Sequence, residues 1–126
     1  MRQITDSDIE NLNSAESGAL NTIVWSKGHL RLNFSWFSIE LSEQFELISK
    51  NDARRIDHPF SDPLPLGGLF GSSVESFHLE PGNKLVVRLD NGAVLRLLPN
   101  ASVEEEQFVL TSHRSRGEEV TSWIII

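Results

Sequence analysis

Apolar and polar residues alternate most regularly between Lys84 and Leu98, on both sides of a turn sequence that ends at Gly92. Alternation around an Asn-Gly pair is typical of an antiparallel β-hairpin. A three-residue turn with Gly92 in the left-handed conformation gives one strand face that is entirely apolar, whereas a two-residue turn mixes charged and apolar residues on both faces. We therefore predict the three-residue form, in which Leu85 faces Leu97, Val87 faces Leu95 and Leu89 faces Ala93.

The same pattern occurs earlier, over His29–Leu41, with the turn at Ser35-Trp36. A two-residue turn there aligns Leu30, Leu32 and Phe34 with Leu41, Ile39 and Phe37. A further strand precedes each hairpin, and a Phe-x-Leu strand follows each one. The chain is therefore interpreted as two repeats, at about 20–49 and 73–111, although alternating β sequences also resemble one another by chance.

These patterns predict a mainly β (β-rich α+β) fold for a single domain, residues 1–126. Its two repeated antiparallel four-strand meander units form a sheet or a partly open barrel. Residues 6–14 begin with capping side chains and carry apolar residues three apart, which predicts one short N-terminal helix.

The segment 51–71 is rich in proline and glycine and is predicted to be a surface loop that links the two units. Leu66, Leu69 and Phe70 are expected to turn into the core. Arg54, Arg55 and His58, with Asp57 between them, form the densest polar cluster of the chain. They are either solvated side chains in which Asp57 pairs with an arginine, or the polar contacts of a ligand pocket.

Trp36 is the aromatic residue for which the pattern gives no inward position. It either anchors a partner or folds back over a neighbouring strand. On the outer face of the second hairpin, His78, Arg88 and Arg96 lie together. An anion is expected between the two arginines, unless Glu104–Glu106 of the same chain pair with them.

The last residues, Val120–Ile126, predict a strand buried on both faces, either central in a sheet or in a subunit interface. Homodimerisation through this segment is one consequence that we consider.

The composition of the chain narrows the range of partners and locations that we expect. A net charge of −7 opposes nucleic-acid binding and suits a basic protein partner, although the charge also serves solubility. The chain has no cysteine, no signal-peptide pattern and no apolar stretch long enough for a membrane span, so we expect a cytoplasmic protein that does not bind membranes. We find no nucleotide, cofactor or hydrolase motif, and the four histidines are not spaced as metal ligands.

The order Leu66…Gly71-x-x-Val74, followed by the hairpin from Leu85 to Leu97, resembles a group of small bacterial proteins. These share a Leu-x-Gly-x-x-Val lead-in before a Leu-x-Leu-x-Phe-Asp-Gly hairpin. The group has no assigned activity, so the resemblance implies no site residue. Other small acidic β proteins act as immunity partners of bacterial toxins, which is an analogy at the level of the fold class.

Two functional hypotheses follow. The first is a non-enzymatic protein-binding module, immunity-like in character, with Trp36 as its anchor and no cofactor. The alternative is a small-molecule-binding protein or hydrolase whose pocket lies under the 51–71 loop.

Overall fold

The computed structural model describes residues 4–26, 29–42, 44–49, 52–56, 64–99, 107–113 and 120–125. Its elements, in chain order, are α1 (Asp6–Asn13), β1 (Leu20–Ser26), β2 (His29–Phe34), β3 (Phe37–Leu41), β4 (Phe45–Ser49), β5 (Asp52–Ile56), the 3-10 helix η1 (Leu64–Leu69), β6 (Val74–Glu80), β7 (Lys84–Leu89), β8 (Val94–Leu97), β9 (Phe108–His113) and β10 (Val120–Ile125).

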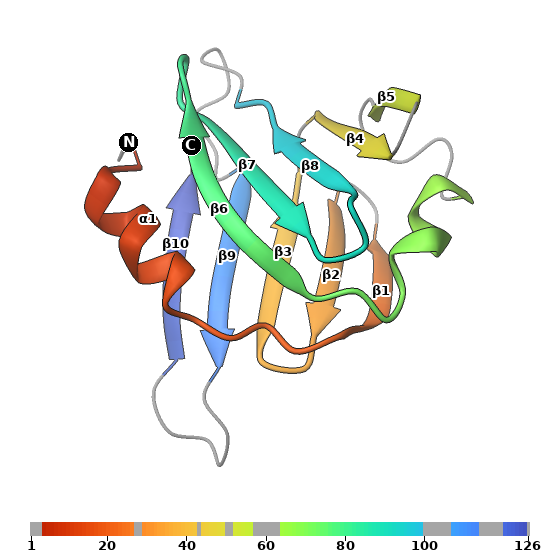
Figure 1. The fold of residues 1–126 in the computed structure, drawn as a ribbon, viewed down its shortest axis with the longest axis horizontal. Coiled ribbons are helices and arrows are strands. Elements are labelled where there is room, and N and C mark those ends of the chain that lie inside the picture. Colours follow the sequence, from red (N-terminus) through yellow and green to blue (C-terminus); the bar gives the residue numbers. More distant parts are fainter. Residues whose placement is uncertain are drawn as a thin grey trace.

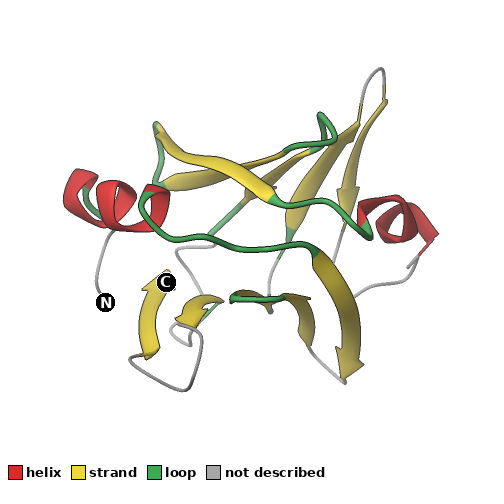
Figure 2. Ribbon diagram, turned by 60° about the horizontal axis from the view of Figure 1, so that its bottom comes forward, coloured by secondary structure: helices red, strands yellow, loops and turns green. Residues whose placement is uncertain are grey.

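The strands form two five-stranded antiparallel sheets, in the orders β1-β2-β3-β9-β10 and β5-β4-β8-β7-β6. One sheet lies in front of the other in Figure 1, and α1 and η1 lie at opposite sides of the pair (Figure 2). The prediction of a mainly β, antiparallel fold with one short N-terminal helix is confirmed.

The pairing differs from the expected meanders at the fourth strand of each unit. β4 was expected beside β3, but it pairs with β8 in the other sheet, and β9 pairs with β3. The chain turns between β3 and β4 and passes from one sheet to the other. This exchange joins the two sheets, and Phe45 of β4 and Phe108 of β9 are fully buried between them.

The two halves of the chain have the same pairing scheme. Each contributes a three-strand meander to one sheet and a two-strand hairpin to the other. A register irregularity between Leu20 and Thr22 of β1 recurs between Val74 and Ser76 of β6. Because both irregularities lie at the start of the first meander strand, positions in β1 and β6 can be compared one by one.

The core lies between the sheets and consists of the inward-facing apolar residues of both meanders. Leu30, Leu32, Leu85, Val87 and Leu95 are all fully buried there. Phe37 of one sheet packs against Phe77 of the other, with ring centroids 5.5 Å apart. The core therefore consists of the two apolar faces that the sequence pattern predicted.

Both predicted hairpin registers are present. In the first, Leu30 is opposite Leu41 and Leu32 is opposite Ile39. In the second, Leu85 is opposite Leu97 and Val87 is opposite Leu95. Gly92 has φ +89°, the left-handed conformation that the three-residue turn requires.

α1 begins with a capping box, in which Thr5 and Asp8 exchange side-chain and backbone hydrogen bonds. Its last residue, Asn13, donates from Nδ2 to the Phe77 carbonyl (2.9 Å) and accepts at Oδ1 from the Phe77 amide (2.7 Å). The helix thereby covers the edge of β6. No helix in the described ranges is long and apolar enough to cross a membrane.

The 51–71 segment is not a plain loop, because it contains β5 and η1. β5 pairs with β4, and an edge position tolerates the charged residues that we interpreted as a loop. β10 is an edge strand among the described strands rather than a central one. Its side chains, and the interface predicted for them, lie outside the described residues.

Candidate functional site

The turn that carries Trp36 is held by the connector between α1 and β1. The Trp36 amide donates to the Ser17 carbonyl (2.8 Å), and the Ser35 amide donates to the Ala19 carbonyl (3.1 Å). Between these two acceptors, Gly18 has φ +68°, and a Cβ there would lie 2.6 Å from Ser35 Cβ and 3.3 Å from Trp36 Cδ1. Glycine is therefore required at the point where the connector crosses the turn.

A second connector, before β6, pairs with the first. Ala19 and Ser73 form an antiparallel bridge, and the Leu20 amide donates to the Ser72 carbonyl (2.7 Å). Ser73 also holds the β7–β8 turn, because its amide donates to Asp90 Oδ1 (3.0 Å) and its carbonyl accepts from the Asp90 amide (2.9 Å). The two connectors thus link both turns. In Figure 1 the connectors and the β2–β3 turn run along the lower edge of the two sheets, and the β7–β8 turn lies higher, in front of β2.

We call the exposed residues of this edge the hairpin rim: Glu16, Trp36, Phe70 and Asp90. Trp36 is 42% exposed and Phe70 is 50% exposed. The Trp36 ring lies against the connector at Gly18 rather than only against a strand, and it still exposes a large part of its surface, so the anchor role stays a prediction. The rim joins apolar and acidic side chains on a hydrogen-bonded frame.

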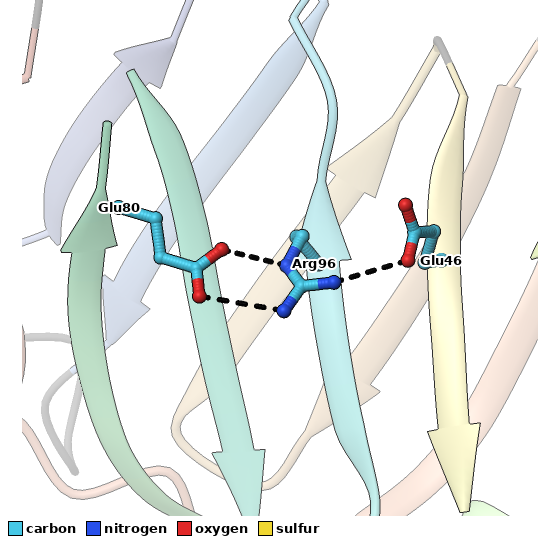
Figure 3. A network of polar contacts seen from close by, with 3 residues as sticks. All are labelled: Glu46, Glu80 and Arg96. Carbon is cyan, nitrogen blue, oxygen red and sulfur yellow. Dashed lines mark hydrogen bonds and ion pairs between the residues drawn. The ribbon is translucent and has the colours of Figure 1, made fainter. Parts of the chain in front are cut away.

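The outer face of the β5-β4-β8-β7-β6 sheet carries a separate polar cluster around Arg96 (Figure 3). Arg96 Nε and Nη2 donate to the two carboxylate oxygens of Glu80 (2.7 and 3.3 Å), and Nη1 donates to Glu46 (3.1 Å). The cluster connects β6, β8 and β4. The internal pairing considered as an alternative to a bound anion is present at Arg96, with Glu80 and Glu46 as partners, whereas Glu104–Glu106 lie outside the described residues.

The cluster also explains why Val86 is only 1% exposed although it lies on an outer face. Val86 is directly opposite His78 on one side and Arg96 on the other. The hydrogen bonding of Arg96 to the Glu80 carboxylate is the largest cause of the raised pKa of the Arg96 guanidinium. Glu46 raises this pKa further, and burial opposes the effect. Arg96 is therefore held charged between two carboxylates.

The other candidates on this face remain apart. Arg88 is exposed and opposite Val94, and it forms no ion pair with any described residue. His78 is half-buried beside Val86. Since Arg96 is taken up by Glu80 and Glu46, the two arginines are not arranged as a shared anion site.

The polar cluster predicted in the 51–71 segment is described only in part. Arg55 is opposite Glu46 in the β4–β5 ladder and Arg54 is opposite Leu47. Their side chains and His58 lie outside the described residues, as does most of the predicted pocket. Within the described ranges, no group of three or more His, Asp or Glu side chains could hold a metal ion.

The sequence interpretation missed three exposed apolar residues. Phe70 was expected in the core, but it follows η1 in a turn and is exposed, whereas Leu69 is buried. Val24 and Trp25 of β1 are 40% and 44% exposed. Adjacent residues of a strand face opposite sides, so the consecutive apolar residues Val24 and Trp25 were the available signal.

Comparisons of the chain with protein-family models, with curated proteins and with solved structures found no match.

Proposed function

We propose that the protein is a non-enzymatic, cytoplasmic binding module, immunity-like in character, that holds a basic protein on the hairpin rim. The observation that carries the proposal is the 42% exposure of Trp36 on a turn whose amides are bonded to Ser17 and Ala19. A tryptophan held in place before binding loses little conformational freedom, and Trp is prominent among residues that dominate interface energies.

The charge of the molecule supports a basic partner. Glu16 directly precedes the connector residue Ser17 that holds the Trp36 turn, and Asp90 is bonded to Ser73 of the second connector. Both acidic residues are exposed, and the whole chain carries −7. Acidic residues around an apolar centre accelerate encounter with a basic surface, and this effect weakens as salt is added. Homodimerisation through Val120–Ile126 is a separate proposal, which the edge position of β10 permits.

The test begins by placing a photo-crosslinking amino acid at position 70 and, as a control, at exposed position 22. A partner that crosslinks from position 70 and not from position 22 is then purified and titrated with the protein. The chain offers a matched pair of tryptophans for this titration, because Trp25 is 44% and Trp36 is 42% exposed.

We expect Trp36→Ala to raise the dissociation constant at least about tenfold, or ~1.4 kcal/mol. Trp25→Ala should change it by less than about twofold. Added salt should slow association with the unmodified chain. Equal effects of the two substitutions, or association that does not respond to salt, would contradict the proposal.

A further inference from the structure

Beyond Leu20, whose amide and carbonyl bond the connector before β6, the edge strand β1 receives none of the usual protection from the described residues. It exposes Val24 (40%) and Trp25 (44%), and its sequence, LNTIVWS, contains no charged residue. Natural edge strands are commonly protected by charges, by proline or by a covering element. β1 therefore presents an uncharged, apolar edge.

Comparison with β6 shows which backbone groups of β1 face outward. Ile23 of β1 and Phe77 of β6 occupy the same place after the register irregularity, opposite Leu32 and Val87. Because Asn13 bonds both the amide and the carbonyl of Phe77, these groups point away from β7. The equivalent groups of Ile23 then point away from β2.

The pair of hydrogen bonds that Asn13 forms with Phe77, which we call the clamp, has no counterpart at β1 among the described residues. The residue that precedes β6 by the same interval as Asn13 precedes β1 is Gly67, which has no side chain to bond Ile23. Among the described residues, none bonds the outward groups of Ile23. The two edges thus differ in that an asparagine bonds the middle of β6, whereas no described residue bonds the middle of β1 from outside.

We propose that β1 pairs with β1 of a second copy of this chain, antiparallel about a two-fold axis at Val24. Val24 then lies opposite Val24 of the second copy, and Ile23 exchanges its amide and carbonyl hydrogen bonds with Trp25 of that copy. This register sets each exposed apolar residue of β1 opposite an apolar residue of the second copy, Val24 opposite Val24 and Trp25 opposite Ile23. Such an isologous contact uses each edge once, so the assembly closes as a dimer.

The local charge favours a second copy of this chain, rather than the basic partner, as the molecule that binds the edge of β1. The outer-face neighbour of Val24 is Arg31, which pairs with Glu40 at 2.8 Å. The surface beside β1 is therefore neutral, whereas the molecule as a whole carries −7. Two copies can meet here without opposing like charges, and a basic segment would find no unpaired carboxylate among these neighbours.

The test is sedimentation equilibrium of the full chain over roughly a hundredfold range of concentration. We expect a monomer–dimer equilibrium, and we expect Val24→Lys and Val24→Glu each to raise the dimer dissociation constant at least about tenfold, because like charges then meet across the axis. A one-to-one mixture of the two variants should form a heterodimer, because opposite charges then meet. Phe70→Lys, at the 50% exposed rim residue, is the control and should leave the dimer unchanged.

A second measurement needs no substitution: the amides of Ile23 and Trp25 should exchange more slowly with deuterium as protein concentration rises. A monomer throughout the range, or a dimer that survives both Val24 variants, would overturn the proposal. In the second case, loss of the dimer in Thr121→Pro would assign it to β10. The dimer is independent of the hairpin rim, so Trp36→Ala should leave it intact and Val24→Lys should leave partner binding intact.

Discussion

Replacing Arg96 by Met should lower stability measurably, because Arg96 of β8 joins its own strand to β6 and β4. The substitution keeps an apolar stem over Val86 and removes the three hydrogen bonds to Glu80 and Glu46. The Arg96 side chain is 27% exposed, and those of Glu46 and Glu80 are 25% and 32% exposed. Both carboxylates would then lose the guanidinium that they share.

Partly exposed ion pairs contribute about 0.2–1 kcal/mol each, and the two-oxygen contact with Glu80 belongs at the upper end. Loss of both pairs should reduce the free energy of unfolding by about 1–2 kcal/mol. In a chain of this size the melting temperature should fall by roughly 4–8 °C. Urea denaturation of the two proteins measures the difference directly.

Arg88→Met is the matched control, since Arg88 lies on the same face without an ion pair to a described residue. Its effect should stay within about 0.5 kcal/mol. A double-mutant cycle of Arg96→Met with Glu80→Gln should give a larger coupling energy than the cycle with Glu46→Gln. Equal effects of Arg96→Met and Arg88→Met, or no coupling to Glu80, would refute the role assigned to the cluster.

Two further substitutions test the close contact of the connector with the Trp36 turn and the hydrogen bonds of Asn13 to the edge of β6. Gly18→Ala should lower the free energy of unfolding, measured by urea denaturation, by at least ~2 kcal/mol, because φ is +68° and the new Cβ would lie 2.6 Å from Ser35 Cβ. Gly92→Ala is the control: its φ is +89° but its Cβ would meet no neighbour, so the loss should be only about 1 kcal/mol. Similar losses of stability in the two variants would show that the connector does not lie close to the Trp36 turn at Gly18. Asn13→Ala should cost about 1–2 kcal/mol and speed amide exchange at Phe77, whereas unchanged exchange there would show that the clamp does not protect the strand.

The hairpins were predictable because they depend on local alternation and on turn residues. Gly92 and the apolar pairs around it specify their register within one short segment. The exchange of β4 and β9 between sheets was not predictable in this way. The exchange depends on the direction that the chain takes after β3. The alternating sequence of β4 is compatible with pairing to β3 or to β8, so the choice between them depends on how the two apolar faces pack.

The candidate site was predictable only in part. Trp36 was singled out because the hairpin pattern gave it no inward position, and its exposure agrees with that. Its contacts with Ser17 and Gly18 come from a connector that has no periodic pattern of its own. Phe70 was misplaced because turn residues after a 3-10 helix follow neither a helical nor a strand period.

Amide hydrogen exchange at the Trp36 turn tests most directly whether the crossed connectors hold the rim in place. Turn amides of an exposed hairpin normally exchange quickly. We expect the amides of Ser35 and Trp36 to be protected to a degree close to that of β2 and β3, because they donate to Ala19 and Ser17 at 3.1 and 2.8 Å. Exchange at the rate of an unprotected turn would contradict the rigid rim and remove the main support for a binding surface there.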